Sequence, residues 1–168
     1  MTINNINIEL TPDQVIVGEH LYAEAINLIL ATAEHELLIF DQDLSHGDFA
    51  SKQKHELFQQ FLNKSPSNQL TIVLQDTGFF QNKCPRLLDL LTIYGHKMTV
   101  YETNQTAKHA KDCFILADDK HYVKRIHIDQ ARFRYSLDDL ATASLLNTRF
   151  KELLEATQDV VTISRLGL

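Results

Sequence analysis

The sequence predicts an α/β fold: a single domain in which a mixed sheet is flanked by helices on both faces. In the first half of the chain, short apolar runs alternate with amphipathic segments of helical period, which predicts parallel strands joined by crossover helices. In the second half, the predicted strands follow one another through short links, so that part of the sheet is expected to be antiparallel. The length of 168 residues suits one core. We therefore predict one domain over 1–168, with its core at about 18–157.

The first half of the chain predicts three helices and three buried strands in alternation. Each helix carries apolar residues three and four positions apart, and the third has Pro85 near its first turn and Gly95 at its end. Ile6 and Ile8 alternate as in a short edge strand before these elements. The predicted elements are a helix at 18–33, a strand at 37–41, a helix at 51–64, a strand at 70–74, a helix at 84–94 and a strand at 98–102.

The second half predicts three further strands and a closing helix. The run CFILA at 113–117 indicates a buried strand, and 121–127 and 131–135 have the polar alternation of half-exposed strands. The closing helix is predicted to begin at Ser136, with Asp139 completing a capping box, and to run to about residue 157.

Composition excludes several classes of protein. The formal net charge of −6 argues against a general nucleic-acid binder, which is usually basic. No apolar run is long enough to span a bilayer, and residues 1–10 have no secretion-signal pattern, so we expect a cytoplasmic protein without membrane insertion. Cys84 and Cys113 are expected to be buried, reduced thiols. Neither belongs to a CxxC pair and the histidines are scattered, so we predict no metal and no cofactor.

Acidic residues follow the predicted parallel strands, where ligand sites of α/β sheets form. Asp41 and Asp43 follow the first strand and Asp76 follows the second. Such a carboxylate cluster can hold a magnesium ion, because hard oxygen ligands suit a hard cation. Acids are also common where strands lead into solvated loops, and that alternative stays open.

The segment LLIFDQDLS at 37–45 resembles the first motif of the haloacid dehalogenase-like phosphatases, an apolar strand followed by Asp-x-Asp. This resemblance implies that Asp41 is a nucleophile and Asp43 a general acid/base in a magnesium-dependent phosphatase. A carboxylate can accept a phosphoryl group when a metal ion screens its charge.

The most basic stretch of this acidic chain lies at 107–134. Strand alternation over 121–127 places Arg125 and His127 on one face, together with His121 and Val123. Arg125, with Arg132 or Arg134 from a neighbouring strand, is expected to fork onto a phosphate group. The alternative is a solvated sheet face whose cations pair with nearby acids, namely Asp118, Asp119 and Asp129.

From about residue 20 to 157, the order of elements resembles the phospholipase D-like (HKD) superfamily. The segments LTIVL and LLDLLTIYGHKMTVYE are similar to its central strand, helix and following strand, and HAKDCFILADDK stands where that family has its HxKxxxxD motif. The resemblance is strongest to uncharacterised bacterial half-domains. Active members join two half-domains around one site, so the resemblance implies a homodimer.

The catalytic motif of that family is incomplete in this chain. Starting from His109 gives Lys111 at the lysine position but Leu116 in place of the aspartate. Starting from Asp118 places Lys111 at the histidine position and Cys113 at the lysine position. An ordinary lysine is protonated near neutral pH and is not a nucleophile.

The resemblance therefore implies a non-catalytic module that binds a phosphate-containing ligand or a protein partner. The residues expected to line the relic site are Lys111, Asp118, Arg125, His127 and Arg132. The alternative function is an enzyme, either a divergent phosphodiesterase or a magnesium-dependent phosphatase with its site at Asp41, Asp43 and Asp76.

Overall fold

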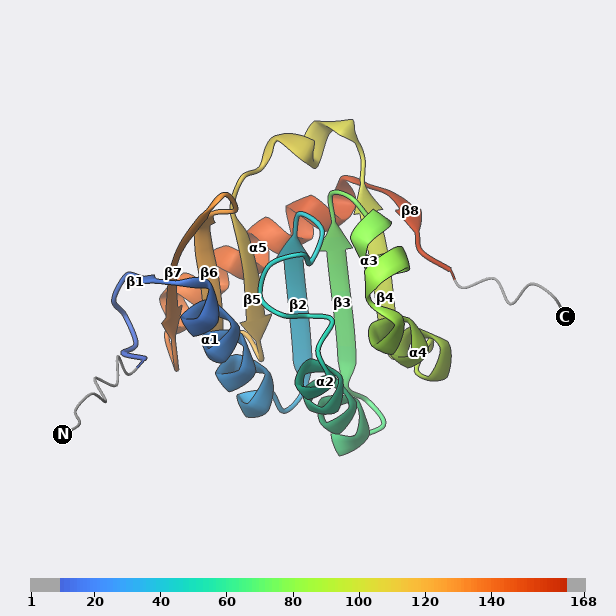
Figure 1. Cartoon of the computed structure of the whole chain (residues 1–168), viewed down its shortest axis with the longest axis horizontal. Helices are drawn as coiled ribbons and strands as arrows, with labels where there is room; N and C mark the ends of the chain where they lie inside the picture. Colours follow the sequence, from blue (N-terminus) through green and yellow to red (C-terminus); the bar gives the residue numbers. More distant parts are fainter. Residues whose placement is uncertain (1–9, 163–168) are drawn as a thin grey trace, which may run out of the picture.

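A computed structural model describes residues 10–162, which form one eight-stranded mixed sheet with helices on both faces (Figure 1). The strands lie in the order β1-β7-β6-β5-β2-β3-β4-β8 across the sheet. In chain order they are β1 Ile16–Val17, β2 Glu36–Asp41, β3 Gln69–Leu74, β4 Met98–Thr103, β5 Cys113–Ala117, β6 His121–His127, β7 Gln130–Ser136 and β8 Thr157–Val160.

The pairing changes from parallel to antiparallel at the middle of the sheet. β2, β3 and β4 pair in parallel, because a helical crossover follows each of the first two. β5 pairs antiparallel to β2 on the other side, with Ile39 opposite Ile115, and the hairpins to β6 and β7 continue that arrangement. As a consequence, the carboxyl ends of β2 and β3 lie at the same edge of the sheet as the start of β5 and the end of β6.

Helices lie on both faces of the sheet, and more of them lie on one face than on the other (Figure 1). The first face carries α1 Glu19–Thr32, α2 Lys52–Lys64, α3 Gly78–Lys83 and α4 Pro85–Ile93; the opposite face carries α5 Leu140–Glu155, and a 3₁₀ helix, η1 Gln105–His109, joins β4 to β5.

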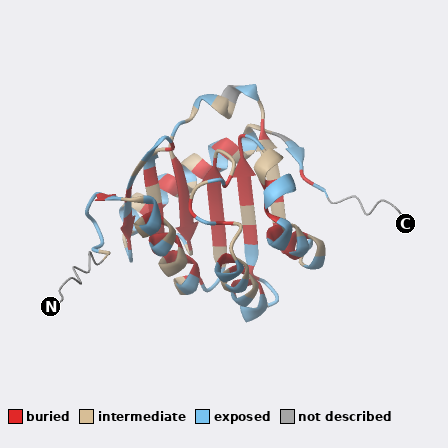
Figure 2. Ribbon diagram, in the orientation of Figure 1, coloured by how far each residue is buried: buried red, intermediate tan, exposed pale blue. Residues whose placement is uncertain are grey.

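Alternate residues of the central strands build two separate cores. Leu37 and Ile39 of β2 point toward α1 and α2, whereas Leu38 and Phe40 point toward α5. The central strands are therefore buried on both faces, while the outer surfaces of the helices are exposed (Figure 2). This two-sided burial explains why these strands read as continuous apolar runs in the sequence.

The structure confirms the predicted fold class and most elements, with one correction at the last helix. This helix begins at Leu140, and its N-cap is Asp139, whose carboxylate accepts a hydrogen bond from the amide of Thr142 at 3.1 Å. Ser136 instead ends β7, where its hydroxyl donates to Asp13 at 2.6 Å. The short elements β1, α3, η1 and β8 were not predicted from the sequence. The strand suggested by Ile6 and Ile8 lies outside the described residues.

Within residues 10–162, the chain forms no helix that is both long and apolar enough to cross a lipid bilayer.

Candidate functional site

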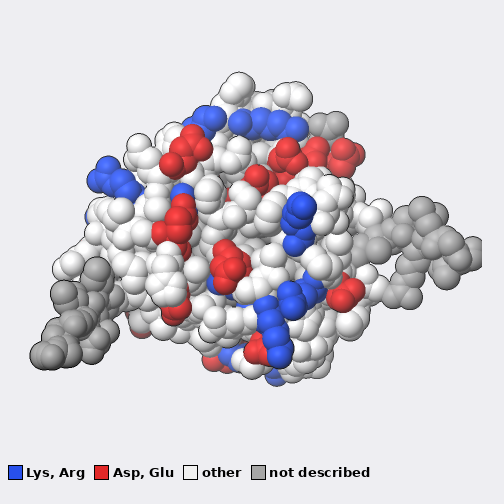
Figure 3. Space-filling model, viewed as in Figure 1, with Lys and Arg blue, Asp and Glu red and all other residues white. Residues whose placement is uncertain are grey.

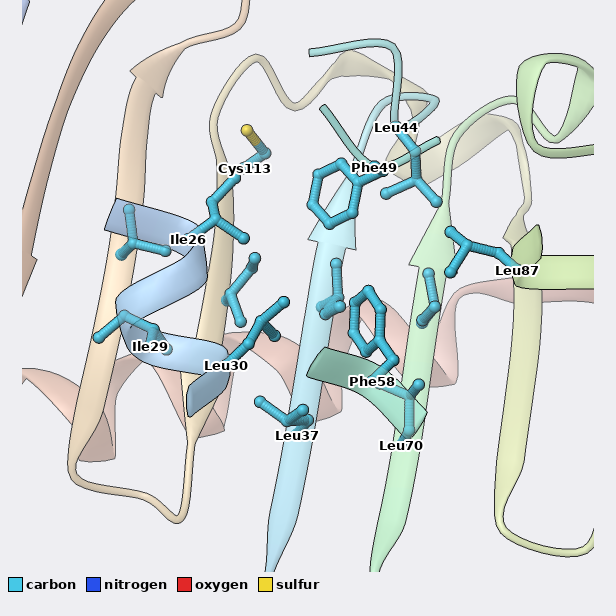
Figure 4. Close-up of a cluster of buried hydrophobic side chains, with 14 of the residues drawn as sticks. Ile26, Ile29, Leu30, Leu37, Leu44, Phe49, Phe58, Leu70, Leu87 and Cys113 are labelled. Atoms are coloured by element: carbon cyan, nitrogen blue, oxygen red, sulfur yellow. The ribbon is translucent and has the colours of Figure 1, made fainter. Parts of the chain in front are cut away.

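The carboxyl edge of β2 and β3 is filled on the α1 side by the loop at 42–50. Leu44 and Phe49 of this loop are fully buried in the core and lie at the end of β2 (Figure 4). Gly47 has a positive φ of 96°, and a Cβ there would lie 2.6 Å from Cδ1 of Ile26. Only glycine fits this close approach, so the loop is pressed onto the edge where a parallel α/β sheet usually holds its ligand.

Beside this loop, Arg125 forms the centre of a buried polar cluster. Its side chain is 1% exposed, and its two terminal nitrogens donate to Oε1 and Oε2 of Glu19 at 2.7 and 2.9 Å. A further bond to the carbonyl of Ile128 at 2.8 Å and stacking on the Tyr22 ring at 4.9 Å fix the plane of the guanidinium. Arg125 therefore presents a rigid pair of N–H donors that fits one oxyanion. In this structure the bound oxyanion is the Glu19 carboxylate.

Glu19 lies at the outer side of this contact, at the first residue of α1. Its side chain is 51% exposed, and Nδ1 of His46 lies 3.4 Å from Oε2. The hydrogen bond from Arg125 lowers the pKa of Glu19, so its carboxylate stays ionised. The N-terminus of α1 adds the positive end of the helix dipole. We call the group formed by Arg125, His46 and the start of α1 the oxyanion seat.

An open hollow of about 540 Å³ adjoins the oxyanion seat. Its lining comes from the first turn of α1 and from the loop that carries His46, namely Glu19, His20, Ala23, Ser45, His46, Gly47 and Asp48. Because Glu19 lines the hollow and bonds to Arg125 behind it, this side chain stands between solvent and the buried guanidinium.

The inner side of the cluster holds Tyr22, Cys113 and Asp41. The Tyr22 hydroxyl lies 3.4 Å from Sγ of Cys113, and burial raises the pKa of that thiol. Burial also raises the pKa of Asp41 to about 7, since no cation bonds its carboxylate in the described part of the chain. Cys113 stands at the lysine position in one reading of the HxKxxxxD motif, so a neutral thiol replaces a cation there.

The five residues predicted for the relic site do not gather at one place. Lys111, Arg125 and His127 lie at the same edge of the sheet, where the amide of Ile128 donates to the carbonyl of Lys111 at 2.8 Å. Lys111 is exposed, and the His127 ring accepts a hydrogen bond from the amide of Asp129 at 3.2 Å. A register irregularity follows Arg125, so the predicted alternation does not continue unbroken to His127.

Asp118 lies at the opposite edge, because it follows β5 whereas Lys111 precedes it. Its carboxylate accepts three backbone hydrogen bonds at the start of β2, from the amides of Glu34, His35 and Glu36, at 2.8, 2.7 and 2.9 Å. Asp118 therefore ties the β5–β6 turn to β2, and five residues of strand separate it from the oxyanion seat.

The predicted fork of Arg125 with Arg132 or Arg134 is wrong. Arg125 pairs across the strands with Phe133, which points into the α1 core. Side chains alternate along a strand, so Arg132 and Arg134 project from the opposite face of the sheet. The backbone register thus divides the basic stretch of the sequence between the two faces.

The acidic residues at the strand ends also stay apart. Asp41 accepts from the amide of Gln42 at 2.6 Å, Asp43 from the amide and hydroxyl of Ser45, and Asp76 from the amide of Gly78 at 2.7 Å. Each carboxylate is turned to its own local backbone. Among residues 10–162, no group of three or more His, Cys, Asp or Glu side chains is arranged to hold a metal ion.

A second feature lies on the α5 face, where Lys124 and Arg134 are direct cross-strand partners. They line a groove of about 420 Å³ together with Asp112, Tyr122, Ile126 and Thr142, which we call the β6–β7 groove. The alternation of 121–127 and 131–135 contained the signal for this pair. On the α1–α4 face, by contrast, Figure 3 shows acidic and basic side chains interspersed.

Comparisons with known proteins identify both the sequence family and the fold. Residues 19–166 match the model of a family described as "Domain of unknown function (DUF7931)". No curated protein matches the sequence.

Many solved structures are similar in fold, and three of them illustrate the likeness. They are TrmBL2, described as an archaeal chromatin protein with a novel mode of DNA binding (TM-score 0.65, 14% identity, 91% of this chain and 56% of that chain), the phospholipase D family member Nuc from Salmonella typhimurium (0.61, 10%, 87% and 95%), and NucT from Helicobacter pylori (0.56, 12%, 86% and 96%). The present chain thus spans little more than half of TrmBL2 but nearly all of Nuc and NucT. At these identities the likeness concerns the fold alone.

Proposed function

Because the chain belongs to the DUF7931 family, whose function is unknown, and has a phospholipase D-like fold, we propose that it is a non-catalytic module that binds a phosphate-containing ligand at the oxyanion seat. The observation that carries this proposal is the Arg125 fork, which is 99% buried and already holds a carboxylate in bidentate geometry beside an open hollow.

The side chains around the seat support binding without catalysis. A phosphodiesterase of this fold needs a nucleophile. His46 acts in this proposal as a hydrogen-bond donor to the ligand, and the other candidates beside Arg125 are Cys113 and Tyr22. Both are buried, and burial raises both pKa values, so neither is ionised near neutral pH. Asp118, the acid of the motif, bonds to backbone amides at the other edge of the sheet. These groups offer no activated nucleophile to a bound phosphate.

The chemistry of the seat favours a phosphate oxyanion. A planar guanidinium with two parallel N–H donors matches two oxygens of a phosphate as well as it matches a carboxylate. The imidazole of His46 and the amino-terminal turn of α1 offer hydrogen-bond donors on the same side, and the helix dipole adds positive potential there. In this proposal Glu19 is an internal substitute for the ligand: its half-exposed side chain swings into solvent when a phosphate enters the hollow and takes its place.

The test measures the binding of inorganic pyrophosphate and of phosphoserine by titration calorimetry and by thermal shift. The variant Glu19→Gln removes the competing charge, so we expect it to bind these probes about tenfold more tightly than the wild type. Arg125→Gln is expected to abolish binding. We expect none of the proteins to hydrolyse a generic phosphodiester.

Arg149→Gln is the matched control, because Arg149 also bonds to a carboxylate, that of Asp112 at 2.6 Å, but lies on the α5 side of the sheet. This variant should bind the probes like the wild type. The proposal fails if Glu19→Gln binds no more tightly than the wild type, or if Arg149→Gln loses binding as fully as Arg125→Gln.

A further inference from the structure

Among residues 10–162, no helix lies over the half of the α5 face that is formed by β6, β7 and β1. The core beneath α5 is built from residues of β2, β3 and β5 and from Tyr122 of β6, which packs with Ala143 and Leu146. Beyond Tyr122, the residues of β6, β7 and β1 that point to this face are half-exposed or exposed; they are Lys124, Ile126, Arg132, Arg134 and Val17. On the other face, α1 covers these same strands.

The size of this uncovered area matches one helix. Neighbouring strands lie about 4.8 Å apart, so three strands present a strip about 10 Å wide, which is the diameter of a helix with its side chains. The β6–β7 groove, about 420 Å³, runs within this strip, and Thr142 of α5 forms one wall. A helix lying in the groove would pack beside α5 as the helices of the opposite face pack beside one another.

The strip combines apolar contacts with positive charge. Ile126 is 49% exposed and Val17 is 64% exposed, and Leu145, one turn beyond Thr142 on α5, is 72% exposed. Between them project Lys124, Arg132 and Arg134. Asp112 lies 3.9 Å from Lys124 and 2.6 Å from Arg149, while within residues 10–162 no ion pair joins Arg132 or Arg134 to a carboxylate.

We propose that this face, defined by Val17, Lys124, Ile126, Arg132, Arg134 and Leu145, docks an amphipathic helix of a partner protein that carries acidic residues along its apolar stripe. The apolar side chains supply the buried contact area, and the cations fix orientation and select against basic partners. A nucleic acid would use the cations but leave the three apolar residues without a contact, and the chain as a whole has a net charge of −6.

The proposal is tested with three labelled 16-residue peptides and fluorescence anisotropy on the full chain. The first has leucines at positions i, i+3, i+4 and i+7 flanked by glutamates; the second has lysines in place of the glutamates; the third is a scrambled form of the first. The first peptide is expected to bind at least about tenfold more tightly than either of the others.

Two substitutions on the face have matched controls on the opposite side of the molecule. Arg134→Glu and Ile126→Asp should each weaken binding of the acidic peptide about tenfold or more. Arg86→Glu and Ile93→Asp, at exposed positions of α4, make the same chemical changes and should leave binding unchanged. Thermal melting verifies that all four variants are folded.

Three results would overturn the proposal. The first is equal binding of the three peptides, or binding that is insensitive to Arg134→Glu and Ile126→Asp. The second is tighter binding of a short DNA duplex that these two variants abolish, which would assign the face to a phosphate backbone. The third is self-association in analytical ultracentrifugation that Ile126→Asp removes, which would assign the face to a second copy of the chain.

Discussion

The two faces of β6 and β7 carry the same kind of side chain in opposite environments. On the α1 face, Arg125 is buried, bonded to Glu19 and stacked on Tyr22. On the α5 face, Lys124, the residue before Arg125, and its cross-strand partner Arg134 project into an open groove. Arg125 and Lys124 are adjacent in the strand, yet the first is buried and the second is partly exposed to solvent.

The difference teaches that helix coverage, and not the local sequence, decides what each cation does. A buried guanidinium must be paired, and removing its partner or the guanidinium itself is costly. An exposed cation stabilises the fold little and remains available to a partner. Four substitutions test this comparison, in order of decreasing effect on the free energy of unfolding.

The largest expected effect comes from Arg125→Ala. This change removes two bonds to Glu19, a bond to the Ile128 carbonyl and the stacking on Tyr22. We expect a loss of about 3–5 kcal/mol in urea denaturation. Arg134→Ala, on the open face, is the control and should cost less than about 0.5 kcal/mol. Equal costs would show that the two faces do not differ as described.

Asp41→Asn is expected to stabilise the protein by an amount that grows as the pH rises above about 4. The pKa of Asp41 is about 7 in the folded chain against 3.8 as the ordinary value, so the unfolded chain loses its proton first. Asp41 therefore does not lower the free energy of unfolding below about pH 4, and it lowers this free energy progressively as the pH rises to about 7. At pH 8 the variant should therefore be more stable by about 2–4 kcal/mol, since one pKa unit equals about 1.4 kcal/mol. Melting curves at pH 5 and pH 8 give the measurement, and a gain of the same size at both pH values would contradict it.

Asp118→Ala should cost about 2 kcal/mol because three backbone amides lose a charged acceptor. Asp118 also has a positive φ of 56°, which alanine tolerates poorly and asparagine accepts. Asp118→Asn keeps one acceptor oxygen and should therefore cost about half as much. Phosphate binding at the oxyanion seat should be unaffected in both folded variants, because Asp118 lies at the other edge of the sheet.

The smallest expected effect belongs to Leu145→Ser on the open rim of the groove. This side chain is 72% exposed, so we expect a change within about 0.5 kcal/mol in the melting experiment. Leu146, the next residue of α5, is 4% exposed and packs against the sheet, so Leu146→Ser should cost several times more. Similar costs for the two would indicate that Leu145 is covered in the isolated protein.

Most of the fold could be predicted from the sequence because burial pattern and helical period are local signals. The runs at 37–41, 70–74 and 113–117 are buried on both faces, and their apolar continuity identifies them directly. The elements that were missed are short: β1 has two residues and β8 four, and their pairing depends on neighbours far away in the chain. The start of α5 was misplaced because both Ser136 and Asp139 have the chemistry of an N-cap.

The site was less predictable, because its geometry depends on contacts between distant residues. Nothing in the sequence around Glu19 indicates a partner 106 positions away, so the ion pair between Glu19 and Arg125 could not be predicted. The division of Arg125 from Arg132 and Arg134 depends on the register of β6 against β7, which one residue of shift would reverse. The placement of Asp118 could be derived from strand length alone, since a five-residue strand separates it from Lys111 and Asp112 at the other edge.

The three amide bonds of Asp118 have a consequence for the use of signature motifs in classifying proteins. In one reading of the HxKxxxxD pattern Asp118 takes the acid position, yet in this chain it fastens a turn to the beginning of another strand. A motif of this kind thus mixes positions that perform chemistry with positions that hold the architecture together. Finding the acid alone is evidence for the scaffold, whereas a functional assignment must come from the positions that would touch a substrate.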